Sequence, residues 1–120
     1  MEEWSIFLRS YIEVVNMKDA ISPAELEKLL DNGAHIKVLD VRRREHRVDV
    51  EFPVPGAEWK DPEQIAEWSK DLENHGEIIV FCVHGHNVSQ GVRDYLRKQG
   101  FGAQILDGGV EAWQAFSKGS

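Results

Sequence analysis

The stretch IIVFCVHGHN, residues 78–87, decides the fold because it joins an apolar segment to a polar loop. Its first part, Ile78 to Val83, is a continuous apolar run, which is typical of a strand buried on both faces of a sheet. The rest, His84 to Asn87, predicts a loop, and residues 88–99 predict a helix that ends at Gly100. Strand, loop and helix in this order indicate one unit of a parallel α/β sheet.

The segments around this stretch continue the alternation of helices and strands. Ser22-Pro23-Ala24-Glu25 predicts a helix start, with serine as N-cap and proline at the first helical position, and Asn32-Gly33 predicts its end. We also expect strands over 35–41 and 103–106, a helix that begins at Asp61, and a helix over 110–116. The alternation predicts a parallel sheet with helices on both faces, whose ligands bind beyond the C-terminal ends of the strands.

The first twenty residues predict a separate helical extension, residues 1–20. Apolar side chains recur there at steps of three and four residues, namely Trp4, Phe7, Leu8, Tyr11, Ile12 and Val15. We expect this helix to pack on the main domain, with a dimer contact as the alternative. Contact with a membrane is disfavoured because Glu2, Glu3 and Glu13 lie on its polar face.

Composition and charge exclude several classes of function. The 120 residues fit a single domain, and 21 acidic against 14 basic residues give a formal net charge of -7, which argues against a nucleic-acid partner. One cysteine cannot form an internal disulfide, and this favours a reducing compartment. The acidic N-terminus and the lack of a long apolar run predict a soluble cytoplasmic protein with no membrane partner.

Cys82 is the candidate nucleophile because it lies where the most apolar strand meets the loop. A short loop before a helix can direct several backbone N–H groups into one concavity, and Gly85 permits the backbone angles of a tight turn. Thiolates are the reactive form of cysteine, and a helix N-terminus or a protonated histidine lowers the pKa of a thiol. The alternative is an inert, buried cysteine that serves only as a small apolar side chain.

A metal site is the second alternative for this loop. Cys82, His84 and His86 alternate along the chain, but residues in alternation share one side only on an extended backbone. The sequence offers no second Cys/His cluster to complete a tetrahedral set of ligands. We therefore expect no metal and no other cofactor.

Several segments, taken together in their order, resemble the rhodanese family. They are Ile21-Ser22-Pro23-Ala24-Glu25-Leu26, Val38-Leu39-Asp40-Val41-Arg42, Val54-Pro55-Gly56-Ala57, Ile79-Val80-Phe81-Cys82, Leu96 with Gly100-Phe101, and Leu106-Asp107-Gly108-Gly109 followed by Trp113. The resemblance implies a rhodanese-like domain over residues 21–117, with a small parallel five-stranded sheet flanked by helices on both faces.

The resemblance also implies an activity, namely a single-domain sulfurtransferase. It would move sulfane sulfur from thiosulfate or a persulfide to cyanide, a small thiol or a protein thiol, through a persulfide on Cys82. Its substrate-binding residues would be Arg47 and the loop residues whose N–H groups form a cradle: Val83, His84, Gly85, His86, Asn87 and Val88. The alternatives are a non-catalytic rhodanese-like binding or regulatory module, and a redox sensor, which would lack a resolving cysteine.

Three features of the sequence refine the expected chemistry. Related phosphatases and arsenate reductases need an arginine six residues after the cysteine, and Val88 stands there, which favours sulfur over phosphate. The loop has no fixed cation, so thiosulfate is expected to be a poor donor, although Arg43, Arg44 and Arg47 could lend charge from the loop before. Asp40 and Arg42 are expected to hold each other and that loop in place.

Overall fold

The computed structural model describes residues 19–46, 53–72, 77–84 and 87–119. Its elements, in chain order, are β1 (Ala20–Ile21), α2 (Pro23–Asp31), β2 (Ile36–Asp40), η1 (Arg44–His46), β3 (Glu58–Trp59), η2 (Pro62–Gln64), α3 (Ile65–Trp68), η3 (Ser69–Asp71), β4 (Glu77–Phe81), α4 (Asn87–Lys98), β5 (Gly102–Leu106) and α5 (Gly109–Gly119). The predicted helix over residues 1–20 lies outside the described residues up to position 18. Within the described part of the chain, no helix has the length and apolar character needed to cross a membrane.

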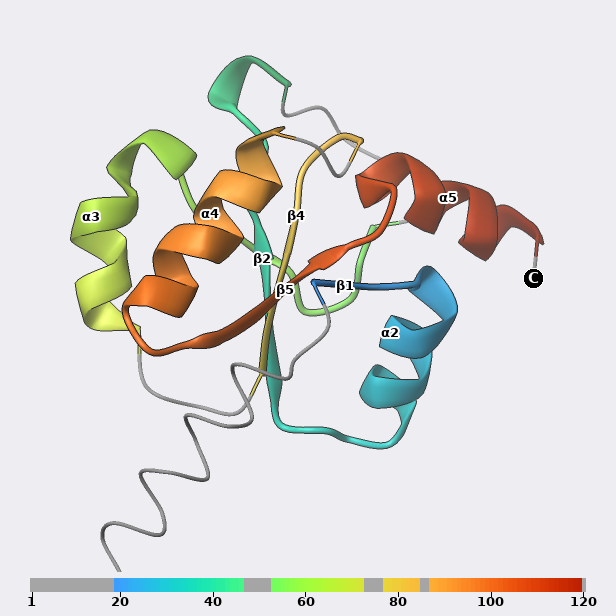
Figure 1. Cartoon of the computed structure of the whole chain (residues 1–120). Coiled ribbons are helices and arrows are strands. Elements are labelled where there is room, and N and C mark those ends of the chain that lie inside the picture. Colours follow the sequence, from blue (N-terminus) through green and yellow to red (C-terminus); the bar gives the residue numbers. More distant parts are fainter. Residues whose placement is uncertain (1–18, 47–52, 73–76, 85–86, 120) are drawn as a thin grey trace, which may run out of the picture.

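The strands form one parallel sheet in the order β1-β5-β4-β2-β3. In Figure 1, α2 and α5 cover one face of this sheet, and α3 and α4 cover the other. The parallel five-stranded sheet with helices on both faces is therefore confirmed. Because β4 lies in the middle of the sheet, the loop that follows it has neighbours on both sides.

β4 is apolar throughout because each of its faces meets a different core. Ile79 and Phe81 belong to the cluster beneath α2 and α5, which includes Trp113. Ile78 and Val80 belong to the cluster beneath α3 and α4. Successive side chains of a strand point to opposite faces, so the continuous apolar run of β4 fills both cores at once.

The start and end of α2 follow the predicted chemistry. Glu25 donates its N–H to Ser22 Oγ over 3.1 Å, and the Glu25 carboxylate accepts from the Ser22 N–H. This reciprocal pair satisfies N–H groups that the first turn of a helix leaves without partners. The chain leaves the helix at Asn32, and Gly33 follows with a φ of 66°.

The structure corrects the predicted bounds of several elements. β4 ends at Phe81, so Cys82 is the first residue of the loop and not part of the strand. The helix predicted from Asp61 is split into η2, α3 and η3, and the Trp68 indole N–H donates to the Asp61 carbonyl over 2.7 Å. That bond joins the end of α3 to the residue that precedes η2. The pattern of apolar residues also missed the edge strands β1 and β3, which have only two residues each.

Candidate functional site

Cys82 lies at the C-terminal end of the central strand and is almost fully buried. Its side chain faces the first turn of α4, where Cys82 Sγ lies 3.3 Å from Ser89 Oγ. Cys82 is 7% exposed and Ser89 is 0% exposed. The thiol donates to the hydroxyl in this pair, and after ionisation of Cys82 the hydroxyl can donate to the thiolate instead. The arrangement therefore provides a protein hydrogen bond for the reactive form of the cysteine.

The N-terminus of α5 holds the start of the cysteine loop from the other side. Val110 donates its N–H to the Cys82 carbonyl over 2.9 Å, and Glu111 donates its N–H to the Val83 carbonyl over 3.3 Å. In a trans peptide the C=O and the following N–H point in opposite directions. The N–H groups of Val83 and His84 therefore point away from α5.

Gly109 allows this close contact between α5 and the loop. It adopts a φ of 65°, and a Cβ atom there would lie 2.4 Å from the Cys82 carbonyl oxygen and 2.6 Å from that of Val83. Both distances are shorter than any ordinary contact, and the φ value is rare for residues with a side chain. The sequence predicted only a turn at Gly108-Gly109, and the structure shows that this turn supports the site.

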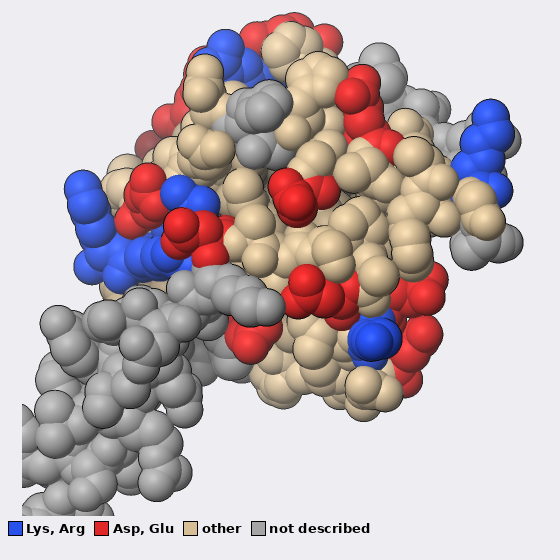
Figure 2. Space-filling model, turned by 45° about the vertical axis from the view of Figure 1, so that its right-hand side comes forward, with Lys and Arg blue, Asp and Glu red and all other residues tan. Residues whose placement is uncertain are grey.

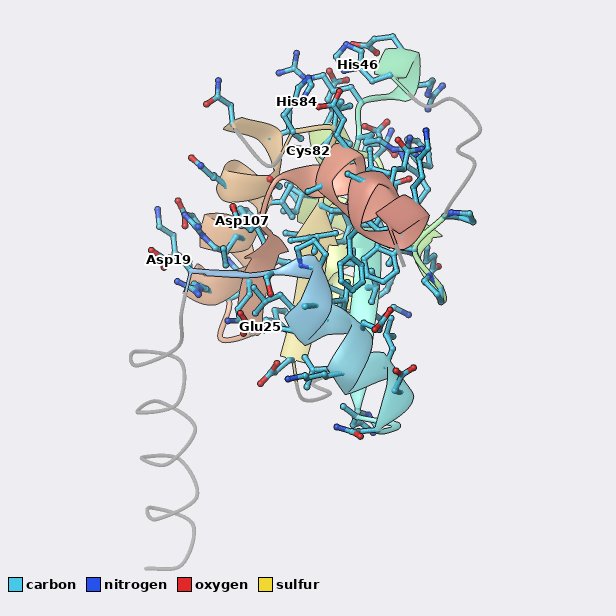
Figure 3. The ribbon with its side chains drawn as sticks, turned by 90° about the vertical axis from the view of Figure 1, so that its right-hand side faces the viewer. Asp19, Glu25, His46, Cys82, His84 and Asp107 are labelled. Carbon is cyan, nitrogen blue, oxygen red and sulfur yellow. The ribbon has the colours of Figure 1, made fainter. Side chains whose placement is uncertain are left out.

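His84 extends from the loop and meets a carboxylate of α5. Its Nδ1 lies 2.8 Å from Glu111 Oε2. Both side chains are exposed, His84 at 56% and Glu111 at 61%. Figure 3 shows His84 beyond Cys82 at the end of the molecule where β4 terminates. The pair thus lies on the rim of the site and not in its interior.

The other predicted loop residues separate into three groups. Asn87 begins α4 and is exposed, whereas Val88 is half-buried and packs against the core cluster beneath α3 and α4. Gly85, His86 and Arg47 lie outside the described residues. Within the described ranges, no group of three or more His, Cys, Asp or Glu side chains could hold a metal ion. The alternative that includes His86 falls outside those ranges.

The loop after β2 carries the predicted pair of Asp40 and Arg42. Arg42 Nη2 lies 2.7 Å from Asp40 Oδ2, Arg42 Nε donates to the same carboxylate, and the two side chains are 9% and 10% exposed. The backbone N–H of Arg42 also donates to Asp40 Oδ1 over 3.0 Å. The prediction that these residues hold each other and the loop is confirmed.

Arg44 is also engaged by neighbouring residues. Its Nη2 lies 3.5 Å from Asp61 Oδ2, and its guanidinium carbon lies 5.9 Å from the centre of the Trp59 ring. Arg43 is exposed in the same loop. On the face shown in Figure 2, basic side chains lie in separate groups with acidic ones between them. The described residues of that face form no continuous basic surface.

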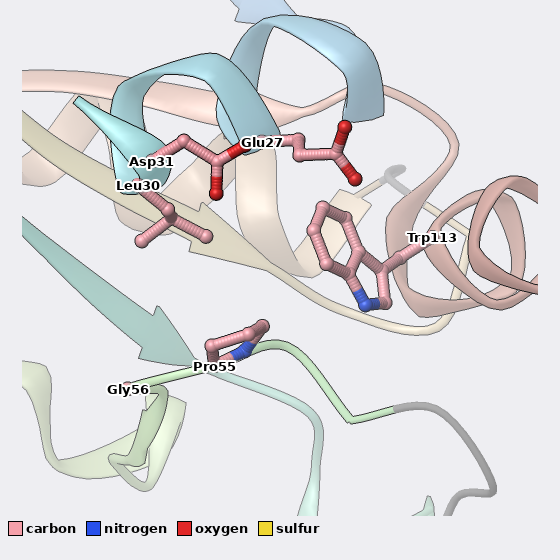
Figure 4. A pocket seen from close by; sticks show the side chains of 6 residues that line it. All are labelled: Glu27, Leu30, Asp31, Pro55, Gly56 and Trp113. Carbon is pink, nitrogen blue, oxygen red and sulfur yellow. The ribbon is translucent and has the colours of Figure 1, made fainter. Parts of the chain in front are cut away.

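A separate hollow lies between α2, α5 and the segment that precedes β3. It measures about 480 Å³ and is lined by Glu27, Leu30, Asp31, Pro55, Gly56 and Trp113 (Figure 4). Among the described residues, the buried Trp113 Nε1 has no hydrogen-bond partner. None of the predicted site residues that the structure describes lines this hollow.

Sequence reasoning missed two residues of the site, Ser89 and Glu111. Ser89 falls inside the predicted helix 88–99, one position after Val88, so its place in the first turn was available as a signal. Glu111 follows the Gly108-Gly109 turn, but nothing in the sequence indicated that this turn would reach the cysteine loop. The contact between the turn and the cysteine loop depends on the order of strands in the sheet.

Comparison with known proteins gives a consistent result. The family model for the rhodanese-like domain matches residues 22–116. The thiosulfate sulfurtransferase GlpE of Pseudomonas fluorescens is 34% identical over 95 residues, which cover 78% of this chain and 83% of that protein.

Solved structures show the same similarity in three dimensions. A rhodanese homolog from Thermus thermophilus is 31% identical with a TM-score of 0.61, and the match covers 78% of this chain and 98% of that one. A rhodanese-related protein from Thermoplasma volcanium has a TM-score of 0.65 at 24% identity, covering 85% of this chain and 94% of that one. The second match shows the fold alone.

Proposed function

The chain belongs to the rhodanese-like domain family and is a sulfurtransferase, and we propose that it carries sulfane sulfur as a persulfide on Cys82. One observation carries this proposal. The sulfur of Cys82 lies at the end of the central strand, within hydrogen-bond distance of Ser89 Oγ, in a loop whose carbonyl groups are bonded by α5. A thiolate at this point has the Ser89 hydroxyl as a donor and lies beyond the C-terminal end of a parallel strand, where ligands of such sheets bind.

The loading step requires a thiolate and a donor with a good leaving group. Cys82 attacks the outer sulfur of thiosulfate, the sulfur–sulfur bond of the donor breaks, and sulfite leaves with the bonding electrons. The product is a Cys82 persulfide, which carries the negative charge on its outer sulfur. With a persulfide donor the same attack releases a thiolate. Two easier steps then replace one direct transfer between donor and acceptor.

The unloading step reverses the role of the cysteine. An acceptor such as cyanide, a small thiol or a protein thiol attacks the outer sulfur, and Cys82 leaves as the thiolate. The hydroxyl of Ser89 is placed to donate to that leaving sulfur, while the loop N–H groups from Val83 to Val88 would hold the charge of the persulfide. Each transfer returns the cysteine to the form that reacts with the next donor. A reducing, cytoplasmic setting suits this cycle because it keeps the single cysteine reduced.

The choice of donor depends on positive charge near the loop. Thiosulfate is the donor in the name of the Pseudomonas relative, and it is a candidate here. Arg42 forms a buried ion pair with Asp40, and Arg44 lies near Asp61 and Trp59, so the described part of that loop offers little positive charge that is not already balanced. We therefore propose that a persulfide is used more efficiently than thiosulfate.

Steady-state kinetics test this function. Thiosulfate or glutathione persulfide is varied against cyanide or a thiol, and a persulfide intermediate predicts parallel lines in double-reciprocal plots. Cys82→Ser should abolish turnover with every donor. Intersecting lines together with activity in Cys82→Ser would overturn the mechanism. A complete lack of turnover with these donors would favour a non-catalytic binding module.

A further inference from the structure

Glu111 contacts the cysteine loop through both its backbone and its side chain. The N–H of Glu111 donates to the Val83 carbonyl, and its carboxylate lies 2.8 Å from Nδ1 of His84. Two successive loop residues are thus bonded to one residue of α5. The backbone bond places Glu111 beside the cysteine loop, and its exposed carboxylate reaches His84, two positions after Cys82.

This carboxylate lies on the exposed rim of the cysteine loop. Cys82 is 7% exposed, so a donor reaches its sulfur only by way of the more open residues around it. His84 and Glu111 are more than half exposed on that rim. The Cα atoms of Cys82 and His84 can lie at most roughly 7 Å apart, so the carboxylate beside His84 belongs to the surroundings of the cysteine loop.

Glu111 makes the charge of the pair one unit more negative than that of His84 alone, whether or not the His84 ring is protonated. If the His84 ring is neutral, the pair carries one negative charge, and if the ring is protonated, the pair is neutral. In both cases Glu111 removes one unit of positive charge from what the loop presents to an anion. Arg42 is paired with Asp40 in a buried ion pair, so it does not restore this charge.

From this geometry we propose that Glu111 is a specificity-determining residue that selects sulfur donors by charge. Its carboxylate, held by His84, disfavours dianionic donors such as thiosulfate relative to monoanionic donors of the same shape. The inference rests on the proposed loading of Cys82 and adds the class of donor that the site accepts.

Two donors that differ by one charge separate this effect from the chemistry. Thiosulfate, with two negative charges, transfers its outer sulfur to the Cys82 thiolate and leaves as sulfite. Methanethiosulfonate has a methyl group in place of one charged oxygen, transfers the same sulfur and leaves as methanesulfinate. In both reactions the thiolate forms one sulfur–sulfur bond, one such bond breaks, and the leaving group takes the electron pair.

The test is the ratio of kcat/KM for thiosulfate to that for methanethiosulfonate. Glu111→Gln keeps a carbonyl oxygen for the His84 ring but removes the charge, so the ratio should rise roughly fivefold. The rise should disappear in about 1 M salt, where the Debye length falls to about 3 Å. A change that merely disturbed the loop would lower kcat/KM for both donors alike, so the ratio would not change and would not depend on salt.

Two control variants sharpen the result. Glu111→Asp retains the charge and should leave the ratio within about twofold of the wild type. Glu77→Gln removes one negative charge at the start of β4, the opposite end of the strand from Cys82, and should leave the ratio unchanged. An equal rise in Glu77→Gln would overturn the inference because it would trace selectivity to net charge.

Failure of the inference and failure of the proposed function give different results. If the wild type turns over both donors and Glu111→Gln shows the wild-type ratio, the charge selection by Glu111 is wrong and the function stands. If neither donor adds sulfur to the wild type, the proposed loading of Cys82 is wrong, and the inference fails with it.

Discussion

Ser89 Oγ lies 3.3 Å from Cys82 Sγ, and both residues are buried. The serine occupies the first turn of α4, and the cysteine is the first residue after β4. A hydroxyl in this position can donate to the thiolate and so stabilise the reactive form of the cysteine. This contact links the fold to the chemistry, because it forms only when the strand and the helix are both in place.

Replacement of Ser89 by alanine should therefore weaken the reactivity of Cys82. A hydrogen bond to a charged group is worth about 1.5–3 kcal/mol, so we expect the rate of alkylation of Cys82 at neutral pH to fall about tenfold. The measurement is the rate of modification by iodoacetamide. Ser69→Ala is the control, since Ser69 is also buried but belongs to η3. Equal rates in Ser89→Ala and the wild type would show that the hydroxyl does not support the thiolate.

Gly109→Ala should damage the support of the cysteine loop. The new Cβ would lie 2.4 Å from the Cys82 carbonyl oxygen, at a backbone φ of 65°. We expect a loss of about 2–4 kcal/mol in the free energy of unfolding, measured by urea denaturation. Gly91→Ala, within α4 and with nothing within 4 Å of its Cβ position, should instead stabilise the chain by up to about 1 kcal/mol. An equal change in the free energy of unfolding in Gly109→Ala and Gly91→Ala would contradict this prediction.

Asp40→Ala should destabilise the fold more than the loss of a surface charge does. The substitution leaves the guanidinium of Arg42 buried without its carboxylate, which costs about 3–5 kcal/mol in the free energy of unfolding. The comparison is Glu58→Gln, which breaks pairs with Lys37 and Lys60 at the surface and should cost less than about 1 kcal/mol. Urea unfolding of both variants measures the difference. A smaller loss in Asp40→Ala than in Glu58→Gln would contradict the prediction.

Asp19 should make a pH-dependent contribution to stability. A hydrogen bond from Arg97, together with the charges of Arg93 and Arg97, holds the pKa of Asp19 below its ordinary value of 3.8. A lowered pKa means that the folded state favours the carboxylate, so this stabilisation is present above 3.8 and is lost as the pH falls through the folded pKa.

Urea unfolding at several pH values tests this sign. Asp19→Asn should be less stable than the wild type at neutral pH, and the gap should close as the pH falls through the lowered pKa of Asp19 in the folded state. A gap for Asp19→Asn that widened in acid would show that the sign is wrong.

The central part of the fold could be predicted from the sequence because its local patterns each indicate one kind of secondary structure. The apolar run before Cys82 fits only a strand covered on both faces, and Ser22-Pro23-Ala24-Glu25 caps a helix by local hydrogen bonds. The edge strands β1 and β3 could not be predicted by pattern, because two residues carry no periodicity. The resemblance to the rhodanese family supplied the number of strands that the pattern did not.

Only the part of the candidate site formed by Cys82 and the residues next to it in the sequence could be predicted. Cys82 and its loop follow from the unit of strand, loop and helix. Ser89 and Glu111 enter the site through contacts at sequence separations of seven and 27 residues, measured from Cys82 and His84 respectively. The contact with α5 arises because β5 pairs with β4 and delivers the Gly108-Gly109 turn beside the cysteine loop. A pairing of this kind is a property of the sheet and leaves no local signal in the sequence.

Intact mass spectrometry of the full chain after brief exposure to thiosulfate or glutathione persulfide tests the central claim most directly. The account predicts that the wild type gains the mass of one sulfur atom, loses it again on addition of cyanide, and that Cys82→Ser gains nothing. A wild type that gains no sulfur from either donor, or a Cys82→Ser variant that gains as much as the wild type, would contradict it.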